Sequence, residues 1–255
     1  MKKKIILKSS ILAVAAGLSV FAINSVFADE LPVQFMGVND FHGALEQTGT
    51  ARLEGETVKN AGTAPLLATY LNDSQKDFET ENAGTPNASI RVQAGDMVGA
   101  SPANSALLQD EPTVKVFNEM NFEYGTLGNH EFDEGLGEFN RIMKGEAPTP
   151  GQFNKIVDEY PHEASKQEVV IANLVDKDTN KIPFDWKPYT IKEIPVNDKT
   201  VKVGFIGVVT TEFPNLVLRK NHEQYRVLDE AESIAKYARE LNDQGVHAIA
   251  VLAHV

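Results

Sequence analysis

The sequence predicts a layered α/β domain, and two observations support this fold class. First, apolar segments with the pattern of strands follow one another along the chain, with helical segments between them. Second, 42% of the 255 residues are hydrophobic and 24% are charged, the composition of a soluble globular protein. A chain of this length forms one large domain, or one domain plus a fragment. The composition excludes wholesale disorder, a collagen-like chain and a polytopic membrane protein.

Several elements are expected in the first half of the chain. Apolar residues at helical spacing after Pro65 predict a helix over 65–71. Residues 79–89 are polar and rich in turn formers, so we expect a surface loop there. Residues 144–164 are expected to be an irregular insertion with a short helix. The remaining expected elements are strands at 33–38, 90–94 and 124–127 and a helix at 113–120.

The second half continues the alternation. Asp229 and Glu232 form a capping box for a helix that ends at Gly245. The expected strands are 169–175, the pair 186–194 and 201–209 with a turn at Asn197-Asp198, and a final buried strand at 246–253. There is no repeat of fixed period and no coiled-coil pattern.

Residues 1–28 have the features of a secretory signal peptide. Three lysines at positions 2–4 precede an apolar run from Ile11 to Ile23, and Val26-Phe27-Ala28 resembles a cleavage site. A retained membrane anchor is the alternative. Removing 1–28 takes away four lysines and no acidic residue, which changes the net charge from −12 to −16. The absence of cysteine at the cleavage point excludes a lipid-anchored lipoprotein, and we expect an exported protein.

Charge and cysteine content narrow the function further. The chain has 24 basic and 36 acidic side chains, so we expect no nucleic-acid polymer as a partner, because binding one requires clustered lysine and arginine. A small anionic substrate stays possible if bound metal ions supply positive charge. With no cysteine, the protein has no disulfide, no thiolate metal site and no cysteine nucleophile.

Short polar clusters follow four of the expected strands directly. They are Asp40-Phe41-His42, Gly95-Asp96, Gly128-Asn129-His130 and Ala253-His254. Sites in α/β sheets collect beyond the carboxyl ends of the strands, so four such ends in one sheet would converge on one crevice. The side chains offer oxygen and nitrogen donors without sulfur, a set that suits Zn, Mn, Fe or Co rather than Ca.

The spacing within these clusters suggests roles. In an extended segment, Asp40 and His42 would point to the same side and reach one ion. Gly95 and Gly128 would permit tight turns before the presumed ligands. The Asp96 carboxylate could bridge two ions, one per oxygen.

His130 and Asp133 stand three residues apart, so the carboxylate could orient the imidazole for proton donation or charge stabilisation. Each site residue also has a structural alternative. These are a polar strand-end turn for Asp40 and His42, an Asx-type cap for Asp96, a helix N-cap with an acidic first turn for Asn129, His130 and Asp133, and a hydrogen-bonded structural histidine for His254. We interpret His162, His222 and His247 as structural or surface residues.

The ordered set of motifs is similar to that of the calcineurin-like metallophosphoesterases. The quoted runs are Asp40-Phe41-His42-Gly43, Gly95-Asp96, Gly128-Asn129-His130-Glu131-Phe132-Asp133 and Ala253-His254. Within this family they resemble the secreted 5′-nucleotidase, UDP-sugar hydrolase and 2′,3′-cyclic-nucleotide phosphodiesterase branch. The resemblance extends over residues 33–255, and the signal peptide resembles those of Gram-positive surface proteins of this branch.

The resemblance implies a layered αββα sandwich and two divalent metal ions. It implies that Asp40 and His42 bind the first ion, that Asp96 bridges both, and that Asn129 and His254 bind the second. It also implies that His130 and Asp133 form the catalytic dyad and that a nucleotide is the substrate. The attack on phosphorus would come from a bridging water or hydroxide.

This sequence lacks one segment of the family pattern. The Gly-His-x-His motif that completes both metal shells, and the C-terminal nucleotide-binding domain, would lie beyond Val255. We therefore expect residues 29–255 to be a truncated catalytic domain of a secreted protein, attached to the cell wall through the missing part. The expected activity is 5′-nucleotidase. The alternatives are a cyclic-nucleotide or dinucleotide phosphodiesterase, or a surface binding or adhesion protein on a degenerate phosphoesterase fold.

Overall fold

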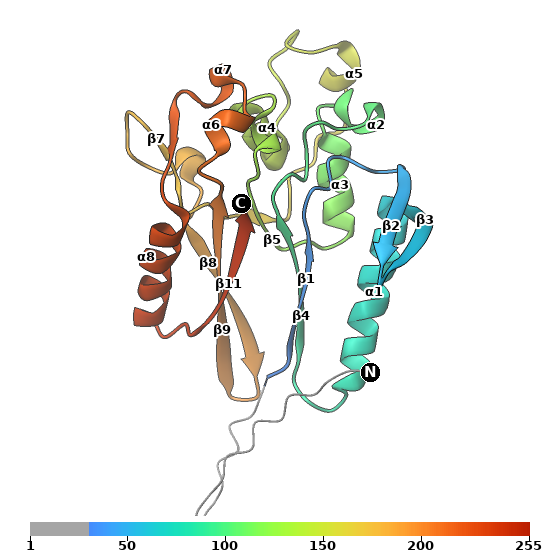
Figure 1. Cartoon of the computed structure of the whole chain (residues 1–255), viewed down its shortest axis with the longest axis vertical. Coiled ribbons are helices and arrows are strands. Elements are labelled where there is room, and N and C mark those ends of the chain that lie inside the picture. Colours follow the sequence, from blue (N-terminus) through green and yellow to red (C-terminus); the bar gives the residue numbers. More distant parts are fainter. Residues whose placement is uncertain (1–30) are drawn as a thin grey trace, which may run out of the picture. The chain divides into compact units, whose positions relative to one another are not determined.

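Two β-sheets lie face to face in the computed structural model, which describes residues 31–255 (Figure 1). The first sheet is parallel with strand order β1-β4-β5-β6. Its strands are β1 (Val33–Val38), β4 (Ala88–Ala94), β5 (Tyr124–Thr126) and β6 (Glu168–Val169). The expected signal peptide, residues 1–28, lies wholly within residues 1–30, which are outside the described part of the chain.

The second sheet has the order β11-β9-β8. Strands β8 (Tyr189–Val196) and β9 (Lys199–Val209) form an antiparallel hairpin, and β11 (Ala248–His254) pairs with β9 in parallel. The hairpin turns at Asn197, whose φ of 50° is the left-handed conformation that asparagine tolerates. The two smaller sheets pair β2 (Thr48–Leu53) with β3 (Glu56–Gly62) and β7 (Leu174–Asp176) with β10 (Tyr225–Val227).

Helices cover the outer faces of both sheets. On the first sheet these are mainly α1 (Ala64–Glu81), α3 (Glu111–Glu119) and α4 (Leu136–Lys144), and on the second sheet α8 (Glu230–Asp243). The short helices are α2 (Ala103–Ala106), α5 (Lys155–Asp158), α6 (Phe213–Leu216) and α7 (Arg219–His222), with 3₁₀ turns η1 (His130–Phe132) and η2 (Pro183–Asp185). This order of layers confirms the expected αββα architecture.

Strand periodicity explains the layers. Ile90 and Val92 of β4 face the second sheet and pack with Phe205, whereas Arg91 between them points to the helices and donates to the Met120 carbonyl. On β9, Ile206 faces the opposite way from Phe205 and packs under α8. The core is therefore three apolar layers, one between the sheets and one beneath each layer of helices.

Several expected boundaries were wrong. The helix expected at 65–71 continues to Glu81, so the loop begins later than residue 79. The strand expected at 169–175 is broken: β6 ends at Val169 and β7 begins at Leu174, with buried, non-strand residues between them. The last strand lies at the edge of its sheet and is largely half-exposed, not buried.

The side-chain half of the predicted capping box at the start of α8 is present. The Asp229 side chain accepts a hydrogen bond from the Glu232 amide at 2.8 Å, and α8 follows directly. Within residues 31–255, every helix is too short or too polar to cross a lipid bilayer.

Candidate metal centre

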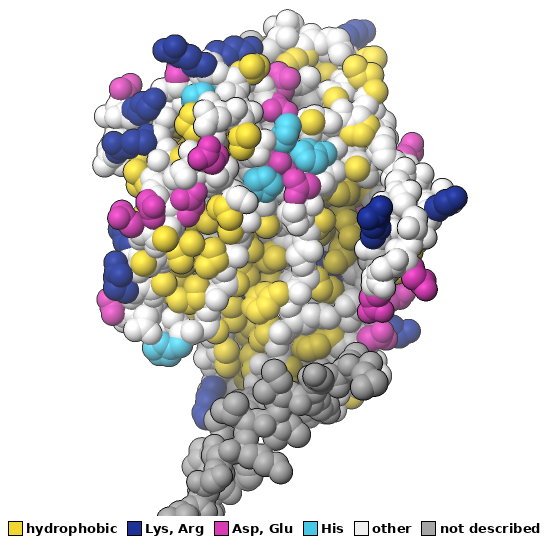
Figure 2. Space-filling model, in the orientation of Figure 1, with side chains coloured by type: hydrophobic (Ala, Val, Ile, Leu, Met, Phe, Trp, Pro, Cys, Tyr) yellow, Lys and Arg dark blue, Asp and Glu magenta, His cyan; other side chains and the backbone are white. Residues whose placement is uncertain are grey.

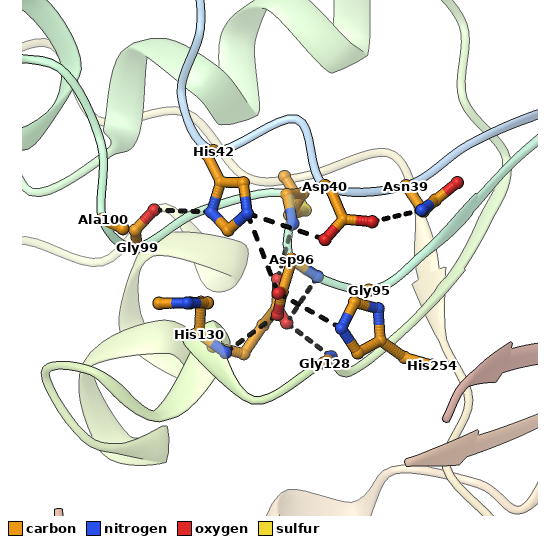
Figure 3. Close-up of polar contacts among 12 residues, drawn as sticks. Asn39, Asp40, His42, Gly95, Asp96, Gly99, Ala100, Gly128, His130 and His254 are labelled. Atoms are coloured by element: carbon orange, nitrogen blue, oxygen red, sulfur yellow. Dashed lines mark hydrogen bonds and ion pairs between the residues drawn. The ribbon is translucent and has the colours of Figure 1, made fainter. Parts of the chain in front are cut away.

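Four chain segments meet at one end of the two sheets, as Figure 1 and Figure 3 show. Asp40 and His42 follow β1, Asp96 follows β4, His130 follows β5, and His254 is the last residue of β11. Three of these ends belong to the first sheet and the fourth to the second. The expectation that all four belong to one sheet was therefore wrong. The crevice forms because the sheets face each other and their strand ends coincide.

Asp96 is at the centre of this group. Its Oδ2 atom lies 3.2 Å from Nε2 of His254 and 3.8 Å from Nε2 of His42. Its Oδ1 atom accepts a hydrogen bond from the His130 backbone amide at 2.8 Å. Asp40 lies on the outer side, with Oδ1 3.7 Å from Nε2 of His42. The Asp96 side chain is only 3% exposed, so its charge is enclosed by these neighbours.

These donor atoms form two overlapping groups that could each hold a metal ion. One contains His42, Asp96 and His130, and the other contains Asp40, Asp96 and His254, with ligand atoms within 4.8 Å of one another in each. Asp96 belongs to both groups. This shared carboxylate is the arrangement expected of a residue that bridges two ions.

Backbone carbonyls fix the direction of two imidazoles. Nδ1 of His42 pairs with the Gly99 carbonyl at 3.0 Å, and Nδ1 of His254 pairs with the Ala94 carbonyl at 2.9 Å. In the neutral imidazole each Nδ1 then carries the hydrogen, and the Nε2 atom turned toward Asp96 is the nitrogen left free for a metal ion (Figure 3). Metal-binding histidines are held in this way by their second nitrogen.

His130 and Asp133 form the predicted pair. Nδ1 of His130 lies 2.8 Å from Oδ2 of Asp133, and this oxygen also accepts a hydrogen bond from the Ala100 amide at 3.0 Å. The His130 ring meets the His42 ring edge-on, with centroids 4.8 Å apart. A pocket lined in part by His130, Asp133 and Phe139 opens beside the pair.

The charges in the group shift one another's pKa values. Burial acts to raise the pKa of Asp96, but the hydrogen bonds from His254 and from the His130 amide, together with the charges of these two histidines, lower it overall. The hydrogen bond between His254 and Asp96 also raises the pKa of His254 to about 9. Burial acts to lower the pKa of His130, but the hydrogen bond to Asp133 and the nearby negative charges of Asp133, Asp96 and Glu131 together raise it. Without a metal ion, the carboxylates thus draw protons onto the imidazoles.

The backbone conformation differs from the extended segment predicted for residues 40–42. Asp40 and His42 have φ of 54° and 49°, and Asp96 has φ of 53°, all in the left-handed region. Such strained conformations cluster at functional sites. Asp40 and His42 meet because the chain turns at both residues.

The two glycines have different roles. Gly95 has φ of +91°, as expected for a tight turn. Gly128 has no positive φ; a Cβ atom there would lie 2.2 Å from Oδ1 of Asp96. Glycine at position 128 is required by space and not by backbone conformation.

Asn129 begins the η1 turn, and its side chain makes no capping hydrogen bond. Asn129 thus occupies the N-cap position with an acidic residue, Glu131, in the first turn, but without the capping hydrogen bond, and its half-buried amide is available as a ligand. Asn129 directly precedes His130 in the loop after β5. The assignment of Asn129 to the second ion stays a prediction.

Glu131 is the residue that sequence reasoning overlooked. It is 2% exposed and accepts hydrogen bonds from three backbone amides of the site loops. Burial and the nearby Asp96 charge raise the pKa of Glu131 to about 7. An acid directly after the candidate ligand Asn129 and the candidate catalytic residue His130 was the available signal.

The donor set fits divalent transition metals. It combines carboxylate oxygens with neutral-imidazole nitrogens, and no lysine or arginine in residues 31–255 forms an ion pair with Asp40, Asp96 or Asp133. Figure 2 shows histidine and acidic side chains gathered on this face above an apolar band. Positive charge is lacking where the carboxylates converge, and bound cations would supply it.

Comparison with known proteins identifies the family. Over 229 residues the chain is 54% identical to the cell wall protein Lmo0130 of Listeria monocytogenes, covering 89% of this chain and 28% of that protein. It is 38% identical to the endonuclease YhcR of Bacillus subtilis, covering 89% of this chain and 17% of that protein. It is 30% identical to a 2′,3′-cyclic-nucleotide 2′-phosphodiesterase/3′-nucleotidase of Salmonella typhimurium over 65% of this chain and 24% of that protein. No family model matches the chain.

Solved structures of phosphoesterases superpose on this chain. The NAD nucleotidase NadN of Haemophilus influenzae superposes with a TM-score of 0.63 at 25% identity, covering 86% of this chain and 34% of that one. The calcineurin-like phosphoesterase YfkN of Bacillus subtilis superposes with a TM-score of 0.60 at 24% identity, covering 87% of this chain and 61% of that one. The chain belongs to the calcineurin-like phosphoesterase family. The phosphodiesterase relative and these two structures confirm the resemblance and the fold class. The chain spans less than a third of the three curated relatives named above.

Proposed function

We propose that this chain is the catalytic part of a metal-dependent phosphoester hydrolase that acts on nucleotides, with 5′-nucleotidase as its activity. The observation that carries the proposal is the buried Asp96 carboxylate, which lies between the free nitrogens of His42 and His254. Two loops of one sheet and the last strand of the other present their donors to this one carboxylate. Decay toward a pure binding protein would not preserve such a convergence, so the enzyme is favoured over the adhesion alternative.

Asp40, His42, Asp96, Asn129 and His254 would hold two divalent ions. When bound, the ions supply Lewis acidity and positive charge for attack on a phosphate ester. Zn, Mn, Fe and Co all suit this donor set. Asp133 holds the hydrogen of His130 at Nδ1, so Nε2 is free to face a phosphoryl oxygen or the leaving oxygen. His130, in its protonated form, then donates a hydrogen bond to that oxygen or gives it a proton.

The substrate class rests on the relatives and on charge. A cyclic-nucleotide phosphodiesterase/3′-nucleotidase and a NAD nucleotidase are among the similar proteins, which supports a nucleotide substrate. The endonuclease YhcR favours a second candidate, cleavage of a nucleic-acid polymer. Against it stands the net charge of −12, which repels a polyanion. Mononucleotides therefore stay the preferred substrates.

We further propose that residues 1–28 direct export and that 29–255 form the catalytic domain, with the remaining ligands and nucleotide-binding part beyond Val255. The relative named a cell wall protein supports a location outside the cell, attached to the wall. Phosphate release by residues 29–255 alone should be much weaker than by the full-length protein. Equal activity of the two would contradict this division.

The test is phosphate release by the full-length protein from AMP, ADP, UDP-glucose and 2′,3′-cyclic AMP, with and without a chelator. Single-stranded DNA is included to test the second candidate, cleavage of a nucleic-acid polymer. We expect release from AMP that the chelator abolishes and added Mn²⁺ restores. Cleavage of DNA with no phosphate release from any mononucleotide would show that the protein is a nuclease and would refute the nucleotidase proposal. Inactivity on all substrates with metal present would refute it.

A further inference from the structure

Glu131 joins the two loops that carry candidate ligands. Its Oε2 atom accepts hydrogen bonds from the Asp96 amide at 2.9 Å and from the Gly128 amide at 2.5 Å. Its Oε1 atom accepts one from the Met97 amide at 2.8 Å. The loop after β4 and the loop after β5 therefore share one buried carboxylate.

The two loops approach each other closely. The space between Gly128 and Asp96 is too small for a Cβ atom. Asp96 also holds the opposite loop through its own hydrogen bond from the His130 amide. Together these contacts make a closed ring in which each loop's acid binds the other loop's backbone.

The geometry also excludes Glu131 from direct ligation. The side chain is 2% exposed, and every hydrogen bond that the structure gives its carboxylate comes from a backbone amide. Three amide donors partly balance its negative charge within the protein. Glu131 belongs to neither of the two groups of donor atoms that could hold an ion.

We propose that Glu131 is a positioning residue for the metal centre: it fixes the distance between Asp96 and the Asn129-His130 segment without touching metal or substrate. The proposal rests on the metal centre put forward above. Residues that orient ligands in this way are worth about 10- to 100-fold in metal affinity or activity.

The informative variant is Glu131→Gln, which keeps the size of the side chain. Glutamine has one acceptor oxygen and places an NH₂ group where the second oxygen stood. At least one of the three amides then faces a donor and loses its partner. The loops should separate slightly, although the side chains of Asp96, Asn129 and His130 remain.

Glu111→Gln is the matched control. Glu111 is 3% exposed, and its carboxylate pairs with Arg141 and His162. It contacts none of the candidate ligands among the described residues. Both variants remove one buried negative charge, so a general loss of stability would affect both.

The experiment measures Mn²⁺ affinity of the full-length protein by competition with a metal-binding dye, together with amide hydrogen exchange at residues 96, 97 and 128. We expect Glu131→Gln to weaken Mn²⁺ binding about 10- to 100-fold and to speed exchange at these amides. Its kcat should return toward the wild-type value at saturating Mn²⁺. Glu111→Gln should keep the Mn²⁺ affinity.

The outcomes separate the two proposals. If wild-type protein binds no Mn²⁺, the metal centre itself is refuted, while the exchange data still report on the loops. If wild type binds Mn²⁺ and Glu131→Gln binds it equally well, only the positioning role of Glu131 is refuted. A kcat that stays low at saturating Mn²⁺ with unchanged exchange would make Glu131 a catalytic group and overturn the inference.

Discussion

Two clusters of histidine and carboxylate side chains in residues 31–255 differ in a way that is instructive. The site cluster contains Asp40, His42, Asp96, His130, Asp133 and His254. The closed cluster contains Glu111, Glu138, Arg141 and His162. In the closed cluster the Arg141 guanidinium lies 2.9 Å from Glu111 and 2.7 Å from Glu138, and Nδ1 of His162 lies 2.6 Å from Glu111.

The clusters differ in their source of positive charge. Burial acts to lower the pKa of Arg141, but its hydrogen bonds with Glu138 and Glu111 raise it, so the closed cluster keeps a permanent cation. The site cluster has only imidazoles against its carboxylates. The same residue types are thus structural where a guanidinium completes them, and available for metal where none does.

The largest expected effect is that of Asp96→Asn. The amide keeps the shape but loses the charge that both groups of donors share. We expect Mn²⁺ binding to be lost and turnover of AMP to fall about 10³-fold or more. Phosphate release and bound-metal analysis check this. Turnover within tenfold of wild type would show that Asp96 is not at the centre of the reaction.

His130→Ala should have a smaller effect of a different kind. The imidazole that donates to the substrate is removed, while the ligands stay, so kcat should fall about 10²- to 10⁴-fold with the metal content unchanged. Metal content is measured by mass spectrometry beside steady-state kinetics. His247→Ala is the control, because this exposed histidine pairs only with Asn242 among the described residues. Unchanged turnover in His130→Ala would remove it from the mechanism.

Arg141→Met tests the closed cluster. Two buried carboxylates would lose their cation, so the free energy of unfolding should fall by about 3–5 kcal/mol. Metal affinity and kcat of the folded protein should not change. Urea unfolding at constant pH measures the loss. A variant as stable as wild type would show that the two clusters do not differ as described.

The smallest effect should come from the surface. Lys155 and Glu159 form an exposed pair one helical turn apart on α5, with 3.4 Å between the charged atoms. Lys155→Ala should change the free energy of unfolding by less than about 0.5 kcal/mol. The same urea experiment sets this baseline for Arg141→Met.

Local rules predicted much of this architecture. Strand alternation located β1, β4, β5 and the β8–β9 hairpin, and the Asp229 cap located the start of α8. The motifs predicted that Asp40, His42, Asp96, His130 and His254 lie close together, and the structure places them in two overlapping groups. These features depend on neighbours in sequence or on strand ends.

Long-range features escaped prediction. The break after Val169 arises because Val170 pairs with Lys187 and the Asn173 amide binds the Val209 carbonyl, contacts that no local pattern reveals. The origin of His254 in a second sheet depends on strand order. The hydrogen bonds of Glu131 form only where the loops after β4 and β5 meet. The residues next to Glu131 in the sequence therefore did not reveal its partners.

The most direct test is anomalous X-ray diffraction from crystals of the full-length protein grown with Mn²⁺. Two metal peaks about 3.5–4 Å apart are expected. The Asp96 carboxylate should lie between them, with His42 on one side and His254 on the other. Peaks only at other sites, or wild-type activity with no metal beside Asp96, would contradict it.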